Sequence, residues 1–310
     1  MTIKLPALVA TSVVRGSHQG ESHGGIYVVD FESRSGRQVV DWNTTSIDFE
    51  GRGADRGLRG IAFDDSDIYV AASDELFCYD QLFEIRSSNR NRYLKHCHEI
   101  CRMNRHIFLT STGFDSLLAF NLDSQEFEWG FHLQRPDGAW GGYTFDPRKS
   151  NGPAAVNDFH INMVHVDGGG IFLSGLKTGA LLHLNRNFEV SEVCNLPLGT
   201  HNARPWREGV LLNDTASDRV RYVGRDGTQK AFRIITYDDK DILFSGVDDT
   251  KIARQGFGRG LAVYQDRFVI GGSSPSTLSL YDLESNQTVG SVNLSMDIRN
   301  AIHGLEIWPF

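Results

Sequence analysis

Short apolar segments recur along the chain in pairs, and a few polar residues separate the two members of each pair. The first segment follows a basic residue or a histidine, as in Arg59-Gly-Ile-Ala-Phe and His98-Glu-Ile-Cys-Arg. The second begins a few residues later, as in Asp67-Ile-Tyr-Val-Ala and His106-Ile-Phe-Leu-Thr. Apolar runs of about 4–8 residues between turn residues are typical of β-strands. The pattern therefore predicts an all-β chain of many short strands.

The pattern occurs six times, and each copy begins at one of six residues that we call the ring residues. These are Arg59, His98, His160, His201, Arg259 and His303. The sixth copy lacks its second segment, and Leu5-Pro-Ala-Leu-Val-Ala-Thr-Ser at the other end of the chain supplies a matching one. A solenoid caps its two ends, whereas a propeller joins them in one shared blade. We therefore predict a six-bladed β-propeller with circular closure by the C-terminal strand, forming a single domain over residues 1–310.

Two of the intervals between ring residues are longer by about 20 residues than a typical blade repeat of about 40–45. The extra residues lie near 131–157 and 231–257. The first insertion contains Trp140 and is expected to cross the face that carries the ring residues, either as a mobile lid over a ligand or as a plug. A polar loop with His18, Glu21 and His23 is expected on the same face, where it either reaches the ring or is simply solvated.

The net charge of −8 argues against a nucleic-acid-binding or anionic-membrane surface. The four cysteines lie in or beside predicted strands and do not form the dense spacing of a disulfide-stapled protein. The N-terminus lacks the pattern of a signal peptide, and no apolar run approaches bilayer length. A cytoplasmic protein is expected.

Four of the six ring residues are histidines, although the chain has only 11. Imidazole is the commonest metal ligand, and imidazoles that converge from separate strands give a preformed site with open positions. We predict that His98, His160 and His201 bind a divalent metal ion, Fe, Mn or Zn. His303 is then either the fourth ligand or a catalytic general base. A Cys/His zinc site at His96-Cys-His-Glu-Ile-Cys is disfavoured, because neighbouring residues of a strand point to opposite faces.

Arg59 and Arg259 flank His303 in the ring order, and two guanidinium groups at one channel mouth would repel each other unless an anion lay between them. They predict a small anionic substrate that carries a carboxylate, phosphate or sulfate. Asn202 and Trp140 are further expected substrate contacts. The alternative is that each arginine bridges neighbouring blades through backbone carbonyls or acids.

Three stretches in the second half of the chain resemble a bacterial propeller family with no assigned activity. That family shows Cys-His-Leu-Asn-Gly, Pro-His-Ser-Pro-Arg-Trp and Thr-Arg-Gly-Leu-Ala-Phe in successive blades. The corresponding stretches here are Phe159-His-Ile-Asn-Met, Thr200-His-Asn-Ala-Arg-Pro-Trp and Gly258-Arg-Gly-Leu-Ala-Val, with Met163 in place of the Gly and Pro205 inserted before Trp206. The resemblance implies the same blade register and implies no activity.

The histidine ring is also similar in kind to the sites of two groups of seven-bladed enzymes. Carotenoid oxygenases bind iron with four histidines, and oligogalacturonate lyases bind their metal with three histidines and a Gln. Six-bladed lactonases of the gluconolactonase type use carboxylate and Asn ligands, a pattern that this ring lacks. These likenesses concern the site alone, because a shared fold does not carry function with it.

These observations favour a metal-dependent enzyme that polarises a small anionic substrate and abstracts a proton, as a lyase or isomerase does. If all four histidines bind iron, oxygenase chemistry is the better hypothesis. A metal-free propeller that binds a ligand or a partner protein is the third.

Overall fold

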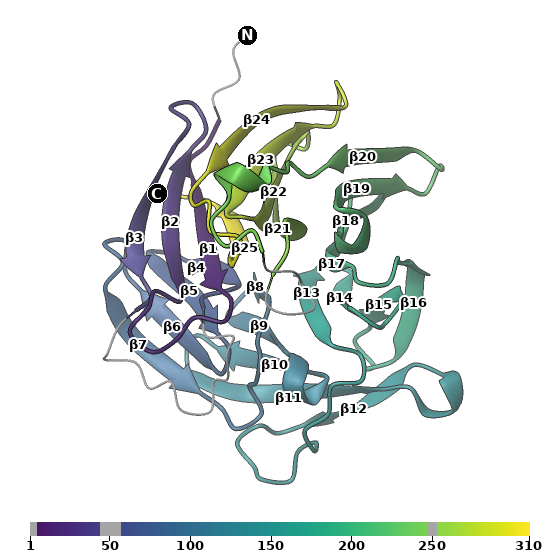
Figure 1. Ribbon diagram of the computed structural model, residues 1–310. Helices are drawn as coiled ribbons and strands as arrows, with labels where there is room; N and C mark the ends of the chain where they lie inside the picture. The colour runs from purple at the N-terminus through teal and green to yellow at the C-terminus, as the bar shows by residue number, and fades with distance from the viewer. Residues whose placement is uncertain (1–4, 44–56, 247–252) are drawn as a thin grey trace. The chain divides into compact units, whose positions relative to one another are not determined.

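The computed structural model describes residues 5–43, 57–246 and 253–310. Within these residues the strands form six antiparallel sheets, five of four strands and one of five (Figure 1). Each sheet corresponds to one copy of the apolar repeat, so the predicted six-bladed β-propeller is confirmed.

The first sheet, which we call the closing blade, contains both ends of the chain: β25 (Asn300–Ile307), β1 (Leu8–Val14), β2 (Gly24–Asp30) and β3 (Ser35–Asp41), in that order. The second sheet consists of β4 (Ile61–Asp64), β5 (Asp67–Ala72), β6 (Glu75–Tyr79) and β7 (Ile85–Arg90). The third consists of β8 (Ile100–Met103), β9 (His106–Ser111), β10 (Ser116–Asn121), β11 (Glu126–Gln134) and β12 (Gly141–Phe145).

The fourth sheet consists of β13 (Ile161–Asp167), β14 (Gly170–Gly175), β15 (Ala180–Leu184) and β16 (Val190–Asn195). The fifth consists of β17 (His201–Trp206), β18 (Gly209–Asp214), β19 (Arg219–Gly224) and β20 (Gln229–Arg233). The sixth consists of β21 (Gly256–Tyr264), β22 (Phe268–Ser274), β23 (Thr277–Asp282) and β24 (Gln287–Asn293). Four short 3-10 helices lie within the described residues: η1 (Thr112–Phe114), η2 (Pro136–Gly138), η3 (Thr215–Ser217) and η4 (Asp239–Asp241).

The chain divides into two compact units. Unit 1 contains Met1–Arg59 and Asn213–Phe310, and unit 2 contains Gly60–Leu212. Unit 1 therefore holds the closing blade and the sixth sheet, and unit 2 holds the second, third and fourth sheets. The single domain over residues 1–310 stays a prediction.

The closing blade joins the two ends of the chain as predicted. In Figure 1 the yellow strand β25 runs beside the purple strand β1. The two strands are antiparallel, with Leu8 opposite Ile307 and Val13 opposite Ala301. Leu8–Val14 is a mostly apolar run that is buried at every position, and it provides a strand covered on both faces for β25 to pair with.

The first insertion differs in part from the expectation. Residues 126–134 and 141–145 pair as β11 and β12, so the hairpin adds a fifth, outer strand to the third sheet. The alternation of Phe127, Trp129, Phe131 and Leu133 extends β11 beyond the usual length and gives β12 an edge to pair with. Residues 146–157 of the insertion form no helix or strand, and their predicted course over the face of the ring residues is not tested. The second insertion includes residues 247–252, which lie outside the described residues.

The apolar core is divided among the contacts between neighbouring sheets. In unit 1 the closing blade packs on the sixth sheet through buried residues such as Leu8, Val29, Leu280 and Ile302. In unit 2 one cluster joins the second and third sheets, and another joins the third and fourth. Burial of aliphatic side chains on both faces of each sheet is the main stabilising contribution.

Threonine hydroxyls within or directly after a second strand hold the backbone of the next ring segment. In unit 1 the hydroxyl of Thr11 donates to the carbonyl oxygen of Arg59, and that of Thr215 donates to Gly258. In unit 2 the hydroxyl of Thr112 donates to Ile161. These bonds give a partner to carbonyl groups at or near the starts of three inner strands, β4, β13 and β21.

None of the helices in the described ranges is of a length and hydropathy to cross a bilayer. The cytoplasmic location stays a prediction.

Candidate functional site

Unit 2 brings three of the predicted metal ligands to the starts of three inner strands. His98 lies two residues before β8, His160 directly precedes β13, and His201 is the first residue of β17. The imidazole rings of His98 and His160 are in contact, with ring centroids 5.2 Å apart and planes at 63°. We use the name histidine cluster for the set His98, His160 and His201, whose convergence on one ion stays a prediction.

His98 is buried and is held by hydroxyl groups of strand β9 and helix η1. Its Nδ1 lies 2.7 Å from the carbonyl oxygen of His96 and 2.9 Å from the hydroxyl of Thr112. Its backbone N–H donates to the hydroxyl of Thr110 at 2.9 Å. Both the backbone and the ring orientation of His98 are thus fixed by neighbours in its own blade.

His160 is positioned by the carboxylate of Asp115. That carboxylate accepts hydrogen bonds from the backbone N–H groups of Asp158, Phe159 and His160, the last at 3.0 Å. His160 has a positive φ of 54°, an uncommon conformation for a residue other than glycine, so the bond to Asp115 stabilises a strained start of β13. Burial raises the pKa of Asp115, and the backbone N–H groups only partly oppose that shift.

The third strand start is linked to the first through a polar bridge. Asn202 donates from Nδ2 to Oε2 of Glu99 at 2.7 Å. Glu99 follows His98 and Asn202 follows His201, so the bridge connects the segments that carry these two imidazoles. The predicted substrate contact Asn202 therefore has a structural partner, and its role toward a substrate stays a prediction.

All three imidazoles present Nδ1 to an oxygen atom. The oxygens are the carbonyl of His96 for His98, Oδ1 of Asn157 for His160 at 3.1 Å, and the carbonyl of Gly199 for His201 at 3.1 Å. A carbonyl oxygen only accepts, so in a neutral imidazole the proton lies on Nδ1 and the lone pair lies on Nε2. Metal-binding histidines usually show this arrangement, in which the second ring nitrogen donates to an oxygen.

Among the described residues, no three His, Cys, Asp or Glu side chains lie in an arrangement that would hold a metal ion. The neighbouring cysteines do not change this. Cys97 is buried in the core between the second and third sheets, and Cys101 packs between the third and fourth. The three metal ligands therefore stay a prediction. The orientations of the imidazole rings agree with it, whereas the described side chains do not form a three-ligand group.

Unit 1 contains the remaining ring residues. Arg259 lies in β21 and His303 lies in β25, and both are buried. A terminal nitrogen of Arg259 lies 3.3 Å from Nε2 and 3.5 Å from Nδ1 of His303. The guanidinium cannot accept a hydrogen bond, so the imidazole meets it as the acceptor.

Two further arginines surround the same part of unit 1. The guanidinium carbons of Arg15, Arg259 and Arg254 lie 4.2, 4.5 and 5.2 Å from the ring centroid of Phe257. Arg254 is paired with Asp218 at 2.7 Å, whereas Arg259 lies beside His303. Arg15 was not singled out by the sequence because it lies outside the repeated segments. Arg59 is fully buried, and its carbonyl oxygen accepts the bond from Thr11.

Trp140 lies in the hairpin at the outer edge of the third sheet. Its indole N–H donates to Glu192 of β16 at 2.6 Å, and its ring packs edge to face on Phe159 at 5.1 Å. The guanidinium carbon of Arg135 lies 4.5 Å from the centroid of the Trp140 ring. Trp140 thus connects the hairpin to the fourth sheet, and its predicted contact with a substrate is not tested by these interactions.

The sequence analysis missed Asp115 and Asp218, which hold the backbone at or just before the starts of two inner strands, β13 and β21. Asp218 accepts from the backbone N–H of Phe257 at 2.9 Å, in the same way that Asp115 accepts from His160. Both aspartates follow a short 3-10 helix and have a positive φ. The signal was available, because Thr-x-x-Asp occurs after the second strand at Thr112 and again at Thr215.

No family model matches the chain, and no curated protein matches it. Solved structures do resemble it. A chain of a nidogen–laminin complex aligns over 97% of this chain and 98% of its own length, with a TM-score of 0.60 and 11% identity. A protein of unknown function from Bacteroides caccae covers 99% and 100%, with a TM-score of 0.59 and 8% identity. Virginiamycin B lyase from Staphylococcus aureus covers 82% and 96%, with a TM-score of 0.50 and 8% identity.

At these identities the likeness concerns the fold alone. It agrees with the propeller architecture and includes one protein without a known activity. The resemblance to one particular bacterial family stays a prediction.

Proposed function

We propose that the protein is a metal-dependent enzyme and that the histidine cluster binds a divalent ion, Fe, Mn or Zn, through its Nε2 atoms. The observation that carries the proposal is the shared orientation of the three imidazoles, each with Nδ1 on an oxygen acceptor. Such an orientation fixes the tautomer that a metal requires before the ion binds. A divalent ion would supply Lewis acidity, which polarises a carbonyl or carboxylate group and acidifies the neighbouring C–H bond.

The residues of the chain itself would position the ligands. Asp115 holds the backbone before β13, and Thr112 and the carbonyl of His96 hold the His98 ring. The Glu99–Asn202 bridge fixes the distance between the segments of His98 and His201. The cluster thus lies on strand starts with little freedom, which keeps the entropy cost of collecting ligands low.

The proposed substrate is a small anion, and the groups that support it are in unit 1. Arg259 offers a buried guanidinium, and His303 offers an imidazole nitrogen within 3.3 Å of it. A carboxylate bound by Arg259 would place its α-carbon near a base, which is the arrangement for proton abstraction by a lyase or isomerase. Arg59 is the second arginine of the proposed anion contact.

A metal-free propeller that binds a small ligand is the second candidate. The direct contact between the imidazole rings of His98 and His160, with centroids 5.2 Å apart, supports it. In that case the contact between His98 and His160 serves proton exchange or ligand binding without an ion.

Metal analysis of protein purified without an affinity tag separates the two candidates. We expect about one equivalent of a divalent metal in the wild type and its loss in His160→Ala, with an unchanged circular dichroism spectrum. His106→Ala is the matched control, because His106 begins β9 outside the cluster and lies 3.9 Å from Glu128. Equal metal content in the wild type and His160→Ala would contradict the assignment, and iron as the bound metal would favour oxygenase chemistry over proton abstraction.

A further inference from the structure

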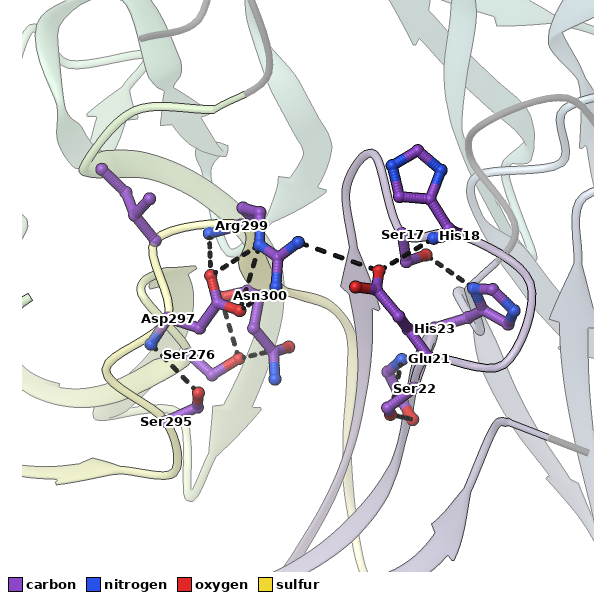
Figure 2. A network of polar contacts seen from close by, with 12 residues as sticks. Ser17, His18, Glu21, Ser22, His23, Ser276, Ser295, Asp297, Arg299 and Asn300 are labelled. Carbon is purple, nitrogen blue, oxygen red and sulfur yellow. Dashed lines mark hydrogen bonds and ion pairs between the residues drawn. The ribbon is translucent and has the colours of Figure 1, made fainter. Parts of the chain in front are cut away.

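A cavity of about 360 Å³ lies in unit 1, in the part drawn in Figure 2. One wall comes from the closing blade and from the loop between β1 and β2. The other comes from the segment between β24 and β25. We propose that this cavity binds a neutral polyhydroxylated molecule about the size of a monosaccharide. The volume is at the lower end of the range for ligand pockets, which favours a small ligand over an extended chain.

The charged groups of the cavity disfavour an anionic ligand. Arg299 donates to Asp297 from Nε at 3.1 Å and from a terminal nitrogen at 2.8 Å (Figure 2). The ring of Phe244 lies 4.0 Å from the guanidinium carbon. An anion would have to displace the carboxylate of Asp297, and the formal charges of Glu21, Asp297 and Arg299 sum to −1. The cavity therefore repels an anion more than it attracts one.

A cationic ligand is also disfavoured. Both oxygens of Asp297 already accept from Arg299. The remaining carboxylate, Glu21, has a half-exposed side chain and lies 3.9 Å from the guanidinium of Arg299. A bond from the backbone N–H of His18 holds the pKa of Glu21 below its usual range. The carboxylate is therefore a hydrogen-bond acceptor, but its charge is shared with an arginine and screened by solvent.

The other polar groups supply donors and acceptors without charge. Tyr27 and Asn300 are each more than nine-tenths buried and line the cavity. Burial raises the pKa of Tyr27, so its hydroxyl remains a donor at neutral pH. Oδ1 of Asn300 accepts from Ser276 at 2.9 Å, which directs the amide NH₂ group away from that bond (Figure 2). The Tyr27 hydroxyl also hydrogen-bonds the side chain of Asn300, so the buried wall presents a connected polar edge to the cavity, and Glu21 adds an acceptor.

A cavity with hydrogen-bond donors, an acceptor and apolar surface fits a ring that carries several hydroxyl groups better than other small molecules. Each hydroxyl donates one hydrogen bond and accepts others, so it can satisfy both Tyr27 and Glu21. Val14 and Leu294 add apolar surface to the same cavity. A sugar ring presents apolar C–H faces between its hydroxyls and so matches a wall of mixed character.

The test uses the full-length protein and ligand-observed saturation-transfer NMR. The probes are neutral hexoses, pentoses and their methyl glycosides, with glucosamine as the cationic comparator and glucose 6-phosphate as the anionic one. We expect at least one neutral probe to bind more tightly than both comparators. Glu21→Ala should weaken that binding by about 10-fold or more, and Tyr27→Phe by about 3–10-fold, as expected for the loss of a charged and a neutral hydrogen bond.

Ser33→Ala is the matched control, because Ser33 lies in the exposed turn between β2 and β3 and does not line the cavity. Glu21 is exposed, so its replacement leaves the fold intact and unchanged melting temperatures verify this. Binding of no neutral probe, tighter binding of either charged comparator, or unchanged binding in Glu21→Ala would each overturn the proposal. The cavity contains no member of the histidine cluster, so a failure of this test leaves the proposed metal site unaffected.

Discussion

In unit 1 the residues that follow Arg259 and His303 are glycines, whereas in unit 2 the residues that follow His98 and His201 are Glu99 and Asn202. The glycines allow inner strands to approach backbone to backbone. A Cβ atom at Gly304 would lie 2.2 Å from the carbonyl oxygen of Arg59. In unit 2, side chains occupy the corresponding positions, and the Asn202–Glu99 bond connects them at 2.7 Å.

The comparison shows two ways to position a ring residue. In unit 1 close packing of the backbone fixes Arg259 and His303, and little space remains for a second polar side chain between the strands. In unit 2 hydrogen bonds from side chains fix the histidines, and those side chains bring additional polar groups to the cluster. The repeat therefore gives each blade one ring residue. At these positions the next residue decides whether the neighbouring backbone packs closely against the ring residue, as at Gly304, or a polar side chain is added beside it, as at Glu99 and Asn202.

The most severe way to break the unit 1 arrangement is to delete residues 303–310. The deletion removes most of β25 and leaves β1 with an unpaired edge that includes fully buried residues. We expect the truncated protein to aggregate or remain unfolded, as measured by size-exclusion chromatography and circular dichroism. A soluble truncation with unchanged thermal stability would contradict the role of β25 in the closure.

A smaller change tests the close approach itself. Gly304→Ala should destabilise the protein by about 3 kcal/mol or more, because the new methyl group meets the backbone of Arg59 and the hydroxyl of Thr11. Chemical denaturation measures the difference. Gly168→Ala is the control, because a Cβ atom there meets nothing within 4 Å. Equal losses of stability in the two variants would show that the close backbone approach at Gly304 is not the reason why glycine is needed there.

The unit 2 arrangement depends on the buried carboxylate of Asp115 and should show this in its pH dependence. The folded-state pKa of Asp115 is raised by burial, so the carboxyl group binds its proton more tightly in the folded than in the unfolded state. Its contribution to stability is fully present below the ordinary Asp pKa and is lost as the pH rises through the raised value.

The variant Asp115→Asn lacks this titration. The free energy of unfolding of the wild type should therefore fall, relative to that of Asp115→Asn, as the pH rises from about 4 through the range just above the ordinary Asp pKa of about 3.9. Denaturation curves across this range measure the difference. A difference that does not change with pH would show that burial does not perturb Asp115.

The smallest expected effect concerns the arginines. Arg259→Lys keeps the charge but loses the planar fork, so binding of a substrate anion should weaken by about 1.5–3 kcal/mol. Sulfate or citrate should raise the melting temperature of the wild type and do little for the double variant Arg59→Gln with Arg259→Gln. Equal stabilisation of the double variant by these anions would assign the arginines to blade bridging.

The repeat and the closure followed from the sequence because they depend on short-range patterns. Apolar segments such as Leu8–Val14 are buried wherever they lie in a sheet, and the unmatched last copy required a partner from the other end. The ring residues were found because the same pattern recurs at each inner strand, although Arg259 and His303 are the fourth residues of β21 and β25 and do not lie at the strand starts. The extra strand β12 was missed, since Gly141–Phe145 pairs only with the unusually long β11.

Tertiary structure decided which distant groups surround those positions. The bond of Asp115 to His160 and the Arg259–His303 contact join residues that lie 45 and 44 positions apart. Such contacts depend on which strand ends lie side by side and not on the local pattern. The cavity of Glu21, Tyr27 and Asn300 has the same origin, because its walls come from opposite ends of the chain and meet only when β25 pairs with β1.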